Sequence, residues 1–148
     1  MKFLIFIALF LLMASSQASE DILTMRSPNS FATTMVKLNE LIAAKGYKIT
    51  ITQRCDFGLK EAGFKTDMYK VVNFGKLSEV RDLTSKHPQL APFLPLRIAV
   101  IAEDNQTLLA ILNPKLFLET VTEPELRAII KSWQNNVSSI FKVINNKL

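Results

Sequence analysis

Residues 96–112 read LRIAVIAEDNQTLLAIL, and this stretch decides the fold class. Two strongly apolar runs, residues 96–102 and 107–112, are separated by the polar residues Glu103-Asp104-Asn105-Gln106. Two such runs joined by a short polar turn are typical of a β-hairpin. Asn113-Pro114 then ends the second strand, because proline has no backbone N–H to donate to a sheet. We therefore predict two antiparallel strands late in the chain.

A long amphipathic helix is predicted over residues 122–144. Its start, Thr122-Glu123-Pro124-Glu125, matches a capping box, and proline is tolerated in the first helical turn. Apolar residues then recur at helical spacing and form one wide stripe: Leu126, Ile129, Ile130, Trp133, Val137, Ile140, Phe141 and Ile144. We expect this helix to pack across a sheet. A stripe that contains a tryptophan could also seat a partner protein or a membrane surface.

The rest of the chain alternates between strand and helix patterns. Strands are predicted at residues 22–25, 47–52 and 68–74, and helices over 31–45, 56–62 and 78–87. Three prolines keep residues 88–95 extended and irregular. This order, with a hairpin late in the chain, indicates an α+β domain. We expect a mainly antiparallel sheet that helices cover on one face.

Polar residues and one glycine predict the helix boundaries. Asn29 or Ser30 caps the first helix, and Gly46 closes it at a position that favours left-handed backbone. Asp56 and Ser78 are expected to cap the two helices that follow.

The first eighteen residues have the three parts of a secretory signal peptide. Met1-Lys2 is a short positive end, residues 3–13 are an unbroken apolar run, and Ser16-Gln17-Ala18 ends in small residues. The apolar run is shorter than the roughly 20 residues that span a bilayer. We therefore expect cleavage near Ala18, a periplasmic or secreted protein, and no transmembrane segment after cleavage.

Residues 19–148 have the length of a single domain. The full chain carries a net charge of +5, from 18 Lys and Arg against 13 Asp and Glu. Its lysines are scattered rather than clustered, so nucleic-acid binding is not indicated. The expected partner is a small ligand or an envelope protein.

Cysteine and histidine each occur once, as Cys55 and His87. No disulfide can form within the chain, and Cys55 is interpreted as an apolar filler. An intermolecular disulfide, a redox thiol and a soft metal ligand are the alternatives. Cys55 with His87 is the one nucleophile–base pair that the sequence offers, and only the tertiary fold could bring them together. Otherwise His87 simply ends a helix before Pro88, where its charge complements the helix dipole.

The signatures of several enzyme classes are absent. The chain has no Gly-x-Ser-x-Gly, no Gly-x-Gly-x-x-Gly and no Walker loop, and one histidine excludes His-Glu-x-x-His. We therefore favour a non-enzymatic protein without a cofactor or a metal.

Arg97 is the main candidate for ligand binding, because it stands at the start of an otherwise apolar strand. A guanidinium in that place either pairs with a carboxylate, such as Glu103 or Asp67, or receives an anionic group. Arg54, beside Cys55, is the second candidate donor.

Several short motifs together resemble the bacterial family called "domain of unknown function 302". They are Ala62-Gly63-Phe64, VVNFGK at residues 71–76, Pro88, FLPLRIAV at residues 93–100, Glu103-Asp104 and Asn113-Pro114. The likeness covers roughly residues 22–147. It implies a compact α+β domain without an established activity, and it supplies no catalytic residues.

The chain departs from that family at two places. Members often carry a histidine before the short helix, where this chain has Cys55, and Lys76-Leu77 replaces the Asn-Pro that usually follows the Phe-Gly step. Whatever the histidine does in relatives is therefore not expected here.

Three functions are compatible with the sequence. The leading hypothesis is an exported binding module that holds a small ligand or a protein partner in a pocket between sheet and helices. The alternative is a thiol- or metal-dependent activity that uses Cys55 and His87. A third possibility is an envelope protein whose terminal helix touches the membrane.

Overall fold

The predicted hairpin forms the centre of the sheet. In the computed structural model, which describes residues 21–146, β4 (Leu96–Glu103) pairs with β5 (Gln106–Leu112). The two strands are antiparallel, and Glu103 lies opposite Gln106 at the turn. The polar residues between the apolar runs therefore close the hairpin as expected.

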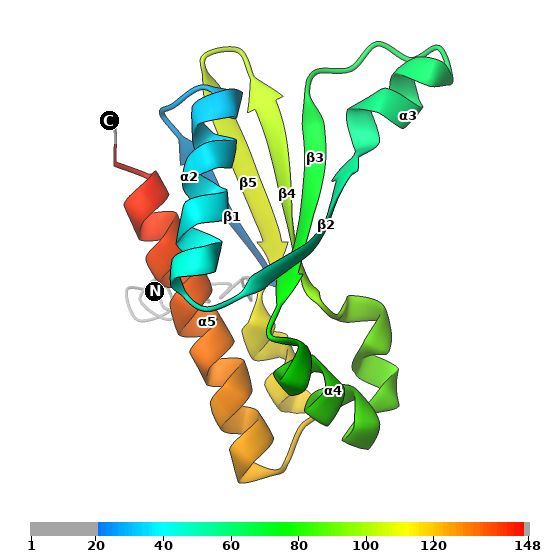
Figure 1. Ribbon diagram of the computed structural model, residues 1–148, viewed down its shortest axis with the longest axis vertical. Coiled ribbons are helices and arrows are strands. Elements are labelled where there is room, and N and C mark those ends of the chain that lie inside the picture. Colours follow the sequence, from blue (N-terminus) through cyan, green and yellow to red (C-terminus); the bar gives the residue numbers. More distant parts are fainter. Residues whose placement is uncertain (1–20, 147–148) are drawn as a thin grey trace, which may run out of the picture.

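Three further strands extend this hairpin into a five-stranded antiparallel sheet (Figure 1). The strand order is β1-β5-β4-β3-β2, with β1 at Ile22–Ser27, β2 at Lys48–Arg54 and β3 at Tyr69–Gly75. β1 and β2 are the edges, so the central hairpin is paired on both sides.

Four α-helices and two 3₁₀ segments complete the described part of the chain. They are α2 (Phe31–Ala44), α3 (Cys55–Glu61), α4 (Leu77–Lys86), η1 (Pro88–Phe93), η2 (Pro114–Glu119) and α5 (Pro124–Ile144). Helices α2 and α5 lie side by side over one face of the sheet, whereas α3 stands out beyond the end of β2 (Figure 1). The fold is therefore α+β with a long C-terminal helix, as predicted.

The apolar stripe of α5 is the largest contribution of a single helix to the core. Its side chains at Ile130, Trp133, Val137, Ile140 and Ile144 are at most 1% exposed. Burying one such aliphatic side chain stabilises a fold by about 1.5–3 kcal/mol. Because the stripe faces the sheet and α2, α5 does not present it to a membrane surface.

The first helix has the predicted boundaries. Ser30 is the N-cap of α2, and its hydroxyl accepts a hydrogen bond of 3.3 Å from the backbone N–H of Thr33. Gly46 follows the helix with φ of +75°, a conformation that side chains with a Cβ rarely adopt.

Three other predicted caps are wrong. The N-cap positions of α3, α4 and α5 are Arg54, Lys76 and Glu123, and none of them makes a side-chain capping bond. Asp56 and Ser78 lie inside their helices because both helices begin earlier than the polar residues suggest. Thr122 lies outside α5, which begins directly at Pro124.

The proline-rich segment before β4 is more ordered than expected. Residues Pro88–Phe93 form η1, because Pro88 stands in the first turn, where its fixed φ suits a helix and its missing N–H costs nothing. A cis peptide bond between Leu94 and Pro95 then leads into β4. The prediction of an extended, irregular segment is therefore wrong for residues 88–93.

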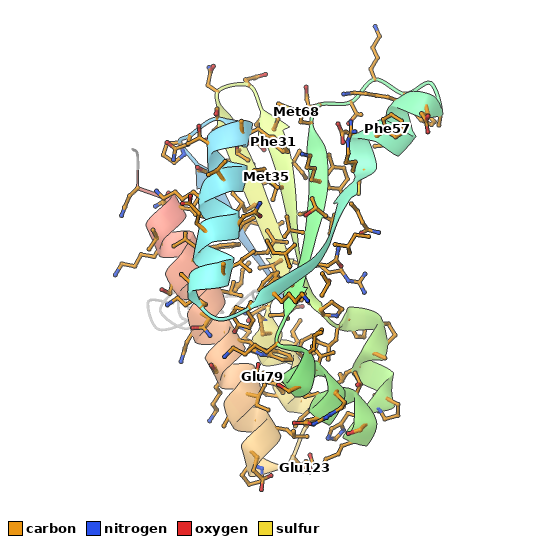
Figure 2. All side chains as sticks on the ribbon, in the orientation of Figure 1. Phe31, Met35, Phe57, Met68, Glu79 and Glu123 are labelled. Atoms are coloured by element: carbon orange, nitrogen blue, oxygen red, sulfur yellow. The ribbon has the colours of Figure 1, made fainter. Side chains whose placement is uncertain are left out.

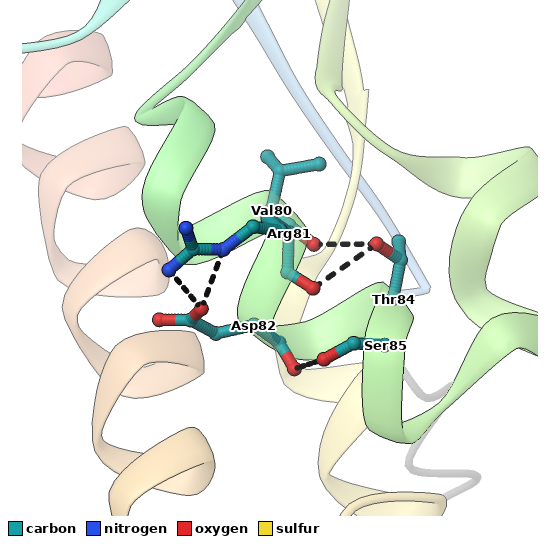
Figure 3. Close-up of polar contacts among 5 residues, drawn as sticks. All are labelled: Val80, Arg81, Asp82, Thr84 and Ser85. Carbon is teal, nitrogen blue, oxygen red and sulfur yellow. Dashed lines mark hydrogen bonds and ion pairs between the residues drawn. The ribbon is translucent and has the colours of Figure 1, made fainter.

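Helix α4 satisfies its outward polar side chains locally (Figure 3). The Thr84 hydroxyl donates to the Val80 carbonyl at 2.9 Å, and the Ser85 hydroxyl donates to the Asp82 carbonyl at 3.0 Å. The Arg81 guanidinium donates to the neighbouring Asp82 carboxylate at 2.8 Å. An ion pair this exposed contributes little to stability. This part of α4 therefore offers no set of converging polar groups for a ligand.

Candidate functional site

No α-helix of the described residues covers the second face of the sheet, which is nevertheless largely apolar. Side chains alternate between the two faces along a strand. On β4, Leu96, Ile98 and Val100 are buried in the core, so Arg97, Ala99 and Ile101 lie on the open face. The register places Ala110 opposite Ala99, and Val71 on the other side of Ala99. The middle of this face is therefore built from small and aliphatic side chains.

A pocket of about 310 Å³ lies over the alanine pair. An alanine opposite an alanine leaves space that longer side chains would fill, and Val71, Leu112 and Ile22 stand around it. The volume is at the lower end of the range for small-molecule sites, roughly 300–1,000 Å³.

Two aromatic rings from the 3₁₀ segments form the wall of the pocket. Phe93 of η1 and Phe117 of η2 lie with their ring centroids 6.3 Å apart and their planes tilted by 45°. Phe117 is buried, whereas Phe93 is 49% exposed and presents part of its ring to solvent. The Arg127 side chain of α5 donates hydrogen bonds of 2.6 Å to the carbonyls of Leu118 and Val121, which ties η2 and the turn after it to α5. The wall is therefore braced from outside the pocket.

Arg97 is the charged residue among those that line the pocket. Its guanidinium donates a hydrogen bond from Nη2 to the carbonyl oxygen of Pro92 in η1. The expected pairing with Glu103 or Asp67 is wrong. Glu103 instead accepts hydrogen bonds of 2.8 and 3.1 Å from Arg26 on the edge strand β1. That bidentate pair holds the pKa of Arg26 above its ordinary value, through hydrogen bonding and charge.

The second candidate donor, Arg54, lies away from this pocket. It stands at the end of β2, and its guanidinium carbon is 5.0 Å from the centre of the Phe57 ring in α3. This cation–π contact steadies the start of α3. The structure therefore does not bring Arg54 and Arg97 together.

Cys55 and His87 also lie apart. Cys55 is the half-buried first residue of α3, followed by Asp56, whose buried carboxylate lies 3.7 Å from Lys60. Figure 2 shows Phe57, two residues after Cys55, at the opposite end of the molecule from Glu123, the residue that His87 contacts. The two candidate catalytic residues therefore do not form a pair.

His87 instead connects the end of α4 to the start of α5. Its Nε2 lies 2.8 Å from a carboxylate oxygen of Glu123, which also accepts a hydrogen bond from the Thr122 backbone N–H at 3.2 Å. The hydrogen bond from His87, supported by backbone N–H groups, holds the pKa of Glu123 below its ordinary value. His87 thus ends its helix as predicted and has a structural partner.

Lys76, at the second departure from the family pattern, also makes structural contacts. Its ammonium nitrogen lies 3.6 Å from Glu79 and 5.3 Å from the centre of the Tyr47 ring. Tyr47 is buried, and this burial raises the pKa of its hydroxyl, which accepts a hydrogen bond of 2.8 Å from Asn136.

No group of three or more His, Cys, Asp and Glu side chains among residues 21–146 is placed to hold a metal ion. No helix in the same range is both long enough and apolar enough to cross a membrane. The predicted signal peptide, residues 1–18, lies outside the described residues.

The pocket residues other than Arg97 escaped the sequence analysis, although a signal for two of them was present. A hairpin with its turn at residues 103–106 pairs residue 99 with residue 110, so the facing alanines follow from the predicted turn. Phe93 and Phe117 had no comparable signal, because they meet through two 3₁₀ segments far apart in the sequence.

Comparisons with known proteins agree with this fold. No curated protein matches the chain. A solved structure, "Crystal structure of uncharacterized conserved protein DUF302 from Bacillus stearothermophilus", has a TM-score of 0.72 and 15% sequence identity. The similarity covers 84% of this chain and 98% of that one, and at this identity it shows the fold alone. A match to the family described as "Domain of unknown function DUF302" spans residues 23–144, nearly all of the described chain. The chain therefore belongs to the DUF302 family.

Proposed function

We propose that this protein is an exported, non-enzymatic module that binds a small, mainly apolar ligand on the open face of its sheet. The observation that carries the proposal is the pocket over Ala99 and Ala110, walled by Phe93 and Phe117. Small-molecule sites are typically concave and mostly apolar, with a few polar groups that orient the ligand. The pocket differs in place from the one expected, because the space between sheet and helices is filled by the core.

The chemistry of the lining favours binding over catalysis. Its residues include no His, Cys, Asp, Glu, Lys or Ser, so the pocket itself holds neither a general base nor a nucleophile. Arg97 is the one charged side chain among them, and a guanidinium offers only hydrogen-bond donors.

The export part of the proposal is supported by the sequence of residues 1–18. A positive end, an apolar run and small residues before Ala18 are typical of a secretory signal peptide. A periplasmic or secreted location would also expose the pocket to ligands from outside the cytoplasm.

The alternative, a thiol- or metal-dependent activity of Cys55 with His87, has less support. The two residues belong to opposite ends of the molecule, and His87 is engaged with Glu123. An activity of this kind would need Cys55 to act with a group other than His87.

A fluorescent apolar probe tests the proposal. N-phenyl-1-naphthylamine is uncharged and becomes bright in apolar surroundings, so saturable fluorescence with the purified protein is expected. Ala99→Leu fills the pocket from its floor and should weaken probe binding by about tenfold or more, since one misplaced side chain in a close-packed site costs about 1–3 kcal/mol. Gln106→Ala changes the same face at the hairpin turn, outside the pocket, and should leave binding intact. Binding that is absent, or unchanged in Ala99→Leu, would contradict the proposal.

A further inference from the structure

We infer that the ligand of this pocket is an apolar monocarboxylate, whose carboxylate Arg97 binds while its hydrocarbon part lies over the alanine pair. The inference rests on the proposed function and specifies its ligand class.

The two arginines on the open face, Arg26 and Arg97, have different partners. Arg26 is neutralised by Glu103, with two hydrogen bonds to one carboxylate. Arg97 has no carboxylate within ion-pairing distance among residues 21–146, and its described hydrogen bond goes to the Pro92 carbonyl. A carbonyl accepts a hydrogen bond without cancelling the charge. Within residues 21–146, the pocket therefore keeps one uncompensated positive charge at its margin.

The positive charge of Arg97 lies next to the alanine pair on the same face of the sheet. Arg97 and Ala99 are two residues apart on β4 and face the same side, so their Cα atoms are separated by about 6–7 Å along the strand. A charged end at Arg97 therefore places the rest of a bound molecule over Ala99 and Ala110. Val71 lies beside Ala99 on β3, and Ile22 lies opposite Leu112 at the Arg97 end of the pocket, and both offer only apolar contacts.

The Arg97 guanidinium is held in one orientation and keeps further hydrogen-bond donors. The contact of Nη2 with Pro92 orients the planar fork against η1. The structure gives Nε and Nη1 no partner among the described residues, so donors remain for a carboxylate. Nη2 also keeps a second hydrogen that lies parallel to an N–H of Nε or Nη1, so a carboxylate can accept two parallel hydrogen bonds from this side chain, and such pairs are short and strong.

The single positive charge of Arg97 limits which class of anion the pocket can bind. One arginine matches one negative charge, whereas a dianionic phosphate buried in these walls would keep an uncompensated charge at a large desolvation cost. The volume of about 310 Å³ suits a single short chain or ring rather than a two-chain lipid.

Three compounds with the same ten-carbon chain test the inference: decanoate, 1-decanol and decylamine. Calorimetric titration of the wild-type protein at neutral pH should give the tightest binding for decanoate, about tenfold tighter than 1-decanol, because charge-assisted hydrogen bonds are the stronger ones. Decylamine should bind most weakly. Arg97→Gln should lower the affinity for decanoate to that for 1-decanol, and Arg97→Lys should retain part of the preference.

Arg26→Gln is the matched control, since it removes an arginine from the same face that is already paired. It should leave the preference for decanoate unchanged. Equal binding of decanoate and 1-decanol to the wild-type protein would overturn the carboxylate inference and leave the pocket's function standing. Failure of all three compounds and of the uncharged probe would overturn both. If Arg97→Gln does not fold, the affinities of the three compounds for the wild-type protein still show whether the pocket prefers a carboxylate.

Discussion

The indole Nε1 of Trp133 donates a hydrogen bond of 2.6 Å to the carboxylate of Glu79. Trp133 is the largest fully buried side chain of the core, and Glu79 stands in the first turn of α4. The bond therefore attaches α4 to the long helix α5, and Lys76 stabilises the same carboxylate from 3.6 Å. A buried tryptophan needs such a partner for its N–H, because leaving it unsatisfied would cost free energy.

Trp133→Phe should lower the free energy of unfolding by about 2–4 kcal/mol, since it removes a hydrogen bond to a charged group and leaves a cavity. Urea denaturation followed by circular dichroism measures the change. Glu79→Gln should cost less, because the amide oxygen can still accept from the indole. Equal stability of Trp133→Phe and the wild-type protein would show that the bond contributes nothing.

The contact between His87 and Glu123 predicts a pH dependence of stability. The pKa of Glu123 is lowered from 4.5 in the folded protein, so the folded state binds this proton less readily than the unfolded state. Its contribution to stability is therefore complete above pH 4.5 and is lost as the pH falls through the lower folded value.

Melting temperatures of the wild-type protein and Glu123→Gln, measured across acid and neutral pH, check this dependence. The wild-type protein should melt higher at neutral pH, and the difference should shrink in acid, where Glu123 is protonated in both states. A difference that stays constant over the whole range would refute the assignment to Glu123.

Two glycine substitutions should have opposite effects. A Cβ at Gly75 would lie 3.2 Å from Val80 Cγ2 and 3.3 Å from Pro95 Cβ, so Gly75→Ala should destabilise the protein by about 1–3 kcal/mol. A Cβ at Gly58, inside α3, meets nothing within 4 Å, and Gly58→Ala should stabilise the protein by about 0.5–1 kcal/mol. Thermal unfolding of both variants measures the contrast, and the same sign for both would contradict it.

The alanine pair predicts a non-additive effect on binding. Ala99→Leu and Ala110→Leu each fill the same hollow, so each should strongly weaken binding of the uncharged probe. The double variant should lose little more affinity than either single variant. Probe titrations of the two single variants and the double variant give the coupling. Fully additive losses would mean that the two residues contact different parts of the probe.

Cys55→Ser separates the binding proposal from a thiol-dependent one. Cys55 is half-buried in α3, away from the pocket, so the variant should bind the probe like the wild-type protein and change stability by about 0.5 kcal/mol or less. Probe titration and urea denaturation test both parts. Loss of binding in this variant would revive a role for the thiol.

Local sequence patterns correctly predicted the helices and strands whose apolar residues recur at regular spacing. The apolar stripe of α5 and the polar turn of the hairpin both depend on neighbours within a few residues, and both are confirmed. The caps at Asp56, Ser78 and Thr122 were wrong because a capping motif describes a preference that tertiary contacts override. At the start of α5, for example, Glu123 rather than Thr122 takes the N-cap position, and its carboxylate contacts His87 and the Thr122 backbone N–H.

By itself, the sequence determined an α+β chain built on a central hairpin and closed by a long helix, because alternation and helical spacing are local properties. Only the tertiary structure decided which face of the hairpin the helices cover, since Ile98 on one face and Ile101 on the other are equally apolar. The same long-range packing pairs Glu103 with Arg26 and places Arg97 beside the pocket. It also separates Cys55 from His87. These relationships join residues far apart in the chain, so no local pattern carries them.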